Sequence, residues 1–214
     1  MMERLNLTGD RQDWYALVDE EVIDPDQEII DPHHHLWHLP GANYLIEELW
    51  ADTESGHRVT KTVFIECHSS YRDNGPNHLQ PVGETEFVAT LANQSRTGPG
   101  PYIAGIVAHA DLRMSDRLPE VLDAHVRAGD GLFRGIRHAG SHAENREFLT
   151  IPGRAPAGLF ADENFREGVR LLGRRGYTYE SWHYHYQLRD FIELARSAPE
   201  TTIILDHFGT PLGV

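Results

Sequence analysis

Cysteine, lysine and positive charge in general are scarce in this sequence of 214 residues. Cys67 is the only cysteine, so the chain cannot form an internal disulfide, as is usual for proteins of a reducing cytoplasm. Acidic residues outnumber lysine and arginine by 33 to 19, which argues against a nucleic-acid or anionic-membrane surface. The sequence has no run of about 20 apolar residues that could cross a membrane, and its start, MMERLNLTGD, contains no apolar signal segment. We therefore expect a cytoplasmic protein that binds neither nucleic acid nor membrane.

What the sequence does contain is a regular alternation of short β-rich runs with helical patterns. A polar lead-in over residues 1–28 precedes a single unit over residues 29–214. The periodicity predicts helices over residues 83–95, 115–128, 162–173 and 188–197. The predicted strands are Ile29–His35, Thr62–His68, Tyr102–His109, Phe133–His138, Tyr177–His185 and Thr201–His207. Strands that alternate with helices of this length indicate βαβ units around a parallel sheet, so the predicted fold class is α/β.

Histidine is unusually frequent, and its placement is regular. The sequence has 14 histidines, and each of the six predicted strands ends in one. Nine lie in or directly after strand ends, namely His33, His34, His35, His68, His109, His138, His183, His185 and His207. One strand-end histidine is more often a hydrogen-bonded loop residue than a ligand, but such a role does not explain six ends out of six. The carboxyl ends of parallel strands meet at one face, where imidazoles can bind a metal or transfer protons.

The sharpest motif is the Asp31-Pro32-His33-His34-His35 run. Side chains on a strand alternate between its two faces, so Asp31, His33 and His35 share one face. Two imidazoles on one face can bind a single ion. The same rule predicts that His183 and His185 point the same way on the fifth predicted strand.

These residues, together with TVFIECH, PVGETEF, IAGIVAHADL, FRGIRH, WHYHYQL and ILDHFGTPLG, resemble the amidohydrolase superfamily. The best match is its branch of TIM-barrel metal-dependent hydrolases, which includes lactonases and related decarboxylases, and it covers residues 29–214. The resemblance implies a TIM (β/α)8 barrel, of which about six βα units are present here. It also implies a hydrolase that opens a carboxylated lactone, or a similar ester or amide, by metal-activated water.

The resemblance also assigns roles to individual residues. His33 and His35 match the metal-binding pair of the first strand, and His185 matches the ligand of the fifth. His183 is a weaker match one register away, and we expect it to contact substrate. His207 matches the histidine of the sixth strand, which lies near the metal-bound water or the substrate, so it is the candidate catalytic residue.

The scarcity of lysine limits which kind of metal centre the chain can form. Binuclear relatives bridge their two ions with a carbamylated lysine from the fourth strand, whereas here that strand ends in Ile136-Arg137-His138. The only lysine, Lys61, lies at the start of the predicted second strand. A lysine-bridged pair is therefore excluded, and we expect one divalent ion, with Zn²⁺ favoured. A metal-free mechanism stays open, because some lactonases of this branch are thought to work without metal.

Arginines and one glutamate complete the candidate site. Arg137, with Arg72 or Arg113, is a candidate for binding a substrate carboxylate through paired hydrogen bonds, although for each arginine a structural or surface ion pair is the commoner role. Glu66 is a candidate to orient a ligand histidine, and a simple buried ion pair is equally compatible with it. The expected partner is thus a small carboxylated molecule.

The resemblance also raises an expectation about the end of the chain. Relatives close eight strands and take an aspartate, a ligand or general base, from the eighth. Six strands are predicted here, and Asp206 neighbours His207 and so is expected to face the opposite side of its strand. We therefore expect a C-terminally incomplete chain with low activity, in which the first and last strands are unpaired edges.

Two other readings stay open at this point. A non-oxidative decarboxylase of an unsaturated or aromatic acid can use the same histidines, and a metal-binding or carbohydrate-sensing domain needs no catalysis. The α/β alternation argues against a two-histidine-one-carboxylate iron oxygenase. The sequence does not determine the substrate, the metal or the oligomeric state. A homo-oligomer is one of the possible states.

Overall fold

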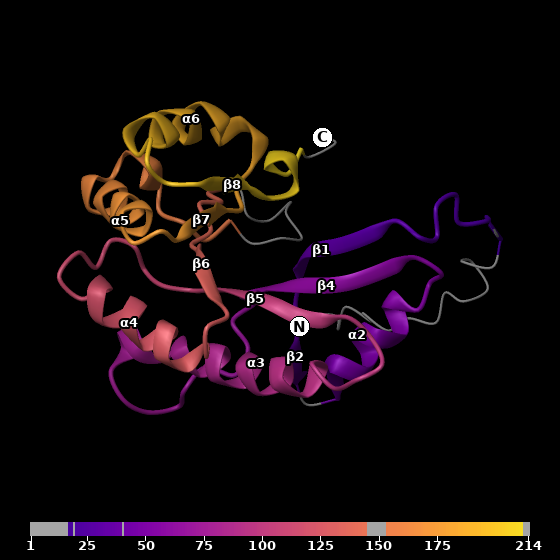
Figure 1. Cartoon of the computed structure of the whole chain (residues 1–214). Coiled ribbons are helices and arrows are strands. Elements are labelled where there is room, and N and C mark those ends of the chain that lie inside the picture. Colours follow the sequence, from indigo (N-terminus) through magenta and orange to yellow (C-terminus); the bar gives the residue numbers. More distant parts are fainter. Residues whose placement is uncertain (1–16, 19, 40, 145–152, 212–214) are drawn as a thin grey trace.

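The computed structural model describes residues 17–18, 20–39, 41–144 and 153–211. Within them, six parallel strands form one curled sheet in the order β1-β4-β5-β6-β7-β8 (Figure 1). The strands are β1 (Glu28–His34), β4 (Arg58–Ile65), β5 (Tyr102–Ala108), β6 (Phe133–Arg137), β7 (Thr178–Ser181) and β8 (Ile203–Leu205). A separate antiparallel pair, β2 (Trp37–Leu39) and β3 (Ala42–Tyr44), follows the first strand. The predicted α/β class and its parallel sheet are confirmed.

Helices connect the strands, as expected of βαβ units. They are α2 (Ile46–Thr53), α3 (Val82–Ser95), α4 (Leu118–Ala128), α5 (Glu163–Arg174) and α6 (Leu188–Ser197). The four predicted helices are present, and α5 begins after Asp162, whose carboxylate accepts hydrogen bonds from two backbone N–H groups. The β2–β3 pair and α2 were not predicted, because each is too short to show a clear period.

Apolar side chains between helices and sheet form two buried clusters. One includes Leu122 of α4, Val169 of α5 and Tyr179 of β7, and the other includes Phe64 of β4 and Val88 of α3. In Figure 1, α3 and α4 lie along β4 to β6, and α5 and α6 lie beside β7 and β8. The helices thus cover one face of the sheet, and polar side chains gather at the carboxyl ends of the strands.

The sheet is open in the part of the chain that the structure describes. Each inner strand pairs on both sides, whereas β1 and β8 each have one neighbour, as expected where six strands of an eight-stranded barrel are present. Most of the predicted polar lead-in, residues 1–16 and 19, lies outside the described residues. Among the helices that are described, none is long and apolar enough to cross a membrane.

The last two strands end earlier than predicted. The fifth and sixth were expected to run to His185 and His207, but β7 ends at Ser181 and β8 ends at Leu205. The chain then turns into the 3-10 helices His185–Gln187 and Asp206–Gly209. His207 has a left-handed φ of 49°. The alternation rule applies only to extended backbone, so it does not hold at these positions.

Candidate active site

The histidine pair of the first strand is the centre of the site. The Nε2 atoms of His33 and His35 are 3.3 Å apart. His35 Nδ1 lies 2.8 Å from the Ile65 carbonyl oxygen, which can only accept, so Nδ1 carries the proton and Nε2 keeps its lone pair. Burial, followed by His35 and Arg137, lowers the pKa of His33 to about 3, and burial also lowers the pKa of His35. Both rings are therefore neutral near pH 7, which is the form that binds metals.

The spacing of this pair fits a divalent metal ion. Two nitrogens bound to tetrahedral Zn²⁺ at 2.0–2.1 Å are about 3.3 Å apart, which is the separation observed between the two Nε2 atoms. Carboxylates of Glu180 and Asp206 offer ligand atoms within 4.8 Å of that of His33. His33 thus has the His35 imidazole 3.3 Å from its Nε2 atom and two carboxylates within 4.8 Å of its ligand atom.

Both carboxylates are buried at the ends of β7 and β8. Burial, followed by the charge of Asp206, raises the pKa of Glu180 to about 8. Burial also raises the pKa of Asp206, against the opposing charge of Arg137. Asp206 Oδ2 has no hydrogen-bond partner among the described residues. Two buried carboxylates this close favour a cation between them.

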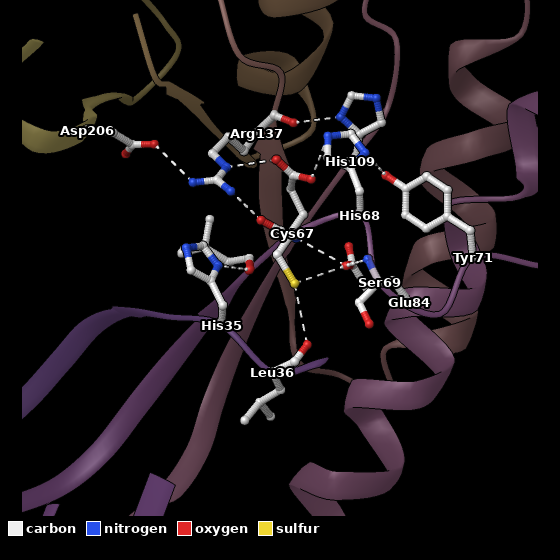
Figure 2. A network of polar contacts seen from close by, with 12 residues as sticks. His35, Leu36, Cys67, His68, Ser69, Tyr71, Glu84, His109, Arg137 and Asp206 are labelled. Carbon is white, nitrogen blue, oxygen red and sulfur yellow. Dashed lines mark hydrogen bonds and ion pairs between the residues drawn. The ribbon is translucent and has the colours of Figure 1, made fainter. Parts of the chain in front are cut away.

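Arg137, at the end of β6, connects this region to the rest of the site. Its Nε donates to Glu66 Oε1 at 2.8 Å, and its Nη2 donates to the Glu66 carbonyl oxygen. Its Nη1 lies 3.6 Å from Asp206 Oδ2 and 3.5 Å from His33 Nε2. Figure 2 shows Arg137 between Asp206 on one side and His68 and His109 on the other. One guanidinium thus contacts groups at the ends of three other strands, β1, β4 and β8.

A cavity of about 490 Å³ opens beside Arg137, at the ends of β4, β5 and β6. Three arginines and three histidines are among its lining residues: Arg113, Arg137, Arg154, His68, His109 and His138. Arg113 pairs with Asp111 and Arg137 with Glu66, whereas the Arg154 side chain has no ion pair among the described residues. A cavity with this lining favours a small anionic molecule.

Solved structures of other proteins have the same fold. Structures of an amidohydrolase from Burkholderia multivorans with bound zinc and of amidohydrolase 2 from Bifidobacterium longum subsp. infantis superpose on this chain with TM-scores of 0.57 and 0.55. Identities are 23% and 21%, over 85% and 87% of this chain and 58% and 64% of those chains. The chain shares the fold of these two structures. The resemblance seen in the sequence is confirmed at the level of the fold.

A sequence relative covers a similar part of the chain. It is an uncharacterized protein, y4mH, of Sinorhizobium fredii, 32% identical over 207 residues, which cover 85% of this chain. The chain spans 62% of the length of that relative. No family model matches the sequence.

In this fold, several of the predicted site residues come together. The His33 and His207 rings are 4.8 Å apart between centroids, and His33, His35, Arg137 and Glu66 are linked as described above. The predicted ring of strand-end imidazoles continues on the other side of Arg137. There His68 and His109, and then His109 and His138, have centroids 5.0 and 5.5 Å apart.

Three other predicted residues are placed differently from what the sequence led us to expect. Arg72 pairs with Glu86 and is not among the residues that line the cavity beside Arg137. His183 is buried with its ring against aromatic side chains, and His185 is exposed at the start of its 3-10 helix, so the two do not share one face. The expectation that Asp206 faces away from the His207 side is wrong, because both residues lie beside His33 once the strand has ended. The roles of Arg72, His183 and His185 remain predictions.

Some residues of the site were not predicted. Glu180 lay in the middle of the fifth predicted strand, which was expected to run to His185. It is next to the strand end only because β7 stops at Ser181. Arg154 follows the undescribed segment 145–152, and no pattern in its irregular neighbourhood indicates its place.

A buried glutamate on α3 holds the loop that follows β4. Glu84 Oε1 accepts hydrogen bonds from the backbone N–H groups of Cys67 at 3.1 Å and Ser69 at 2.7 Å. Cys67 Sγ lies 3.4 Å from the Leu36 carbonyl oxygen and 3.6 Å from Glu84 Oε1. Burial, followed by the charge of Glu66, raises the pKa of Glu84 to about 7. This glutamate therefore titrates near neutral pH.

We predict that replacing Glu84 with glutamine flattens the pH dependence of stability. The folded state keeps the Glu84 proton up to about pH 7, whereas the unfolded chain loses it near pH 4.5. The free energy of unfolding of the wild type should therefore fall as pH rises across this window. The fall expected from this group is about 3 kcal/mol. Glutamine keeps an oxygen for both backbone N–H groups, so urea denaturation of E84Q should lack this component.

Glu86, on the same helix, provides the control. Its hydrogen bond with Arg72 lowers its pKa, so E86Q should remove a small contribution of opposite sign. Equal pH profiles of the wild type and E84Q would show that Glu84 is ionised throughout this range.

Proposed function

We propose that this protein is a metal-dependent hydrolase of the amidohydrolase type that opens a carboxylated lactone or a similar ester or amide. The observation that carries the proposal is the 3.3 Å separation of the His33 and His35 Nε2 atoms. The amidohydrolase from Burkholderia multivorans, which shares the fold, was solved with bound zinc. The arginine-lined cavity beside Arg137 supports a carboxylated substrate.

His33 and His35 would hold the metal ion, with Asp206 and Glu180 beside them. When bound, a divalent ion at this point supplies a Lewis acid that polarises a carbonyl and lowers the pKa of water. Whether His185 adds a further ligand remains a prediction. Arg137, held by its hydrogen bonds to Glu66, would fix the Asp206 carboxylate next to His33.

Two further residues complete the proposed chemistry. Arg154 lines the cavity without an ion pair among the described residues, so its guanidinium is the one best placed to receive a substrate carboxylate. His207 is exposed beside the His33 ring and is placed to give a proton to the leaving oxygen through an imidazole nitrogen.

The test is an assay of the chain, with Zn²⁺ and after chelation, on matched lactones with and without a carboxylate. We expect metal-dependent proton release without CO₂, and a preference for the carboxylated member of each pair. In R154A, KM for the carboxylated lactone should rise about tenfold or more, from loss of one charged hydrogen bond. KM for the neutral lactone is the internal control and should not change.

Two outcomes would contradict the proposal. Release of CO₂ from unsaturated or aromatic acids would favour the decarboxylase reading, which uses the same histidines. Equal turnover with and without metal would remove the role proposed for His33 and His35.

A further inference from the structure

A second group of metal-binding side chains lies on the other side of Arg137 from the His33–His35 pair. Glu66 and His68 follow β4 and His109 follows β5, and their ligand atoms all lie within 4.8 Å of one another. All three line the 490 Å³ cavity. We propose that Glu66, His68 and His109 form a separate site for one first-row divalent metal ion, open to that cavity.

The main observation is a buried carboxylate oxygen without a partner. Glu66 is 2% exposed, and its Oε1 accepts the hydrogen bond from Arg137 Nε. Its Oε2 is buried and has no hydrogen-bond partner among the described residues. The His68 Nε2 atom is 3.5 Å away, too far for a good hydrogen bond. A buried acceptor left in this state is costly, and a cation between Oε2 and the imidazoles would satisfy it.

His109 is held in the form that binds a metal. Its Nδ1 lies 3.1 Å from the Arg137 carbonyl oxygen and must donate to it, which leaves the lone pair on Nε2. Burial lowers the pKa of this ring, despite the opposing charge of Glu66, so it is neutral. A metal-bound histidine usually makes such a contact through its other nitrogen.

His68 is positioned in the same way. Its Nδ1 lies 2.9 Å from the Tyr71 hydroxyl, so its Nε2 is the atom directed at Glu66. Figure 2 shows the His68 and His109 rings close together beside Arg137, with Tyr71 on the side away from Arg137. His68 also has a left-handed φ of 62°, and Glu84 secures this turn through the N–H groups of Cys67 and Ser69. The loop thus keeps one imidazole over the free oxygen of Glu66.

The chemistry of these donors selects the ion. Two imidazoles and one carboxylate suit Zn²⁺, Co²⁺ and similar ions better than Mg²⁺ or Ca²⁺, which prefer oxygen ligands. Arg137 contacts the other oxygen of Glu66, so the guanidinium does not occupy the position between Oε2 and the histidines. With three protein ligands and the cavity adjacent, a position remains for water or an anionic ligand.

Cobalt titration of the full chain tests the proposal directly. Co²⁺ bound by histidine and carboxylate gives a visible absorption band, so binding is read without any substrate. In the H33A/H35A background, which removes the first candidate site, we expect one Co²⁺ to bind with this band. Adding H68A and H109A should abolish the band and weaken Co²⁺ binding by at least a hundredfold. Adding H57A instead, an exposed histidine away from both sites, should change neither.

A single substitution keeps the test valid if the quadruple variant fails to fold. The His68 side chain is 61% exposed, so H68A should keep the circular dichroism and thermal unfolding of its parent. It should still weaken Co²⁺ binding at least tenfold. Unchanged Co²⁺ binding in folded H68A, or absence of Co²⁺ from the H33A/H35A chain, would overturn the proposal. Failure to hydrolyse lactones would leave it standing, because this site does not depend on the proposed function.

Discussion

Replacing Arg137 with methionine is expected to lower the free energy of unfolding by about 3 to 5 kcal/mol. The Glu66 and Asp206 side chains are 3% and 1% exposed, and Arg137 is the arginine that contacts both. Removing the guanidinium leaves two buried negative charges close to each other without their cation. Methionine has a similar length, so the loss reports mainly on charge and hydrogen bonds. Urea denaturation at neutral pH measures the difference.

Arg72 offers a matched control. Its guanidinium pairs with Glu86 at the surface, and R72M should cost less than about 1 kcal/mol. A second check uses R137M/E66Q, in which one of the buried charges is removed as well. This variant should recover part of the lost stability. Equal costs for R137M and R72M would mean that the buried network contributes little to folding.

Replacing His33 and His35 together with alanine is expected to have the largest effect on metal binding and turnover. The pair supplies two of the imidazole ligands proposed for the catalytic ion. Loss of a residue that merely orients a ligand costs 10–100-fold in metal affinity. Loss of both ligands should therefore cost more than about a hundredfold and reduce turnover to background. Competition with a zinc chelator measures affinity, and single-turnover kinetics measures the chemical step.

The H68A/H109A variant is the control for this experiment. It should keep zinc at the His33–His35 pair, so the two double variants should each lose one ion, from different positions. H57A, at an exposed histidine away from both sites, should behave as wild type. If H33A/H35A kept the zinc affinity and turnover of the wild type, the proposed role of this pair in the mechanism would be wrong.

The sequence predicted those parts of the fold and site that depend on regular backbone. Alternation along an extended strand predicted that His33 and His35 share one face. In the structure their Nε2 atoms are 3.3 Å apart. The same rule did not hold for Asp206 and His207, because the chain leaves the strand at Leu205 and enters a left-handed turn. Backbone that is no longer extended gives no sequence period from which the direction of a side chain can be read.

Contacts between distant segments were also beyond reach from the sequence alone. Glu66 and Arg137 are 71 residues apart in the sequence. Their side chains meet because β5 is the single strand between β4 and β6 in the sheet. Arginine at 137 was expected to contact substrate, and it lines the cavity, but its nitrogens are also bound to Glu66. Only the three-dimensional arrangement shows that one side chain serves both purposes.

The half-buried thiol of Cys67 offers a chemical probe of the loop that Glu84 holds. Burial raises the pKa of this thiol, and the reactive form of cysteine is the thiolate. Loss of the contacts with Leu36 and Glu84 should therefore raise the alkylation rate of Cys67. The dependence of this rate on urea separates local loosening of the loop from global unfolding. With one cysteine in the sequence, no engineered background is needed.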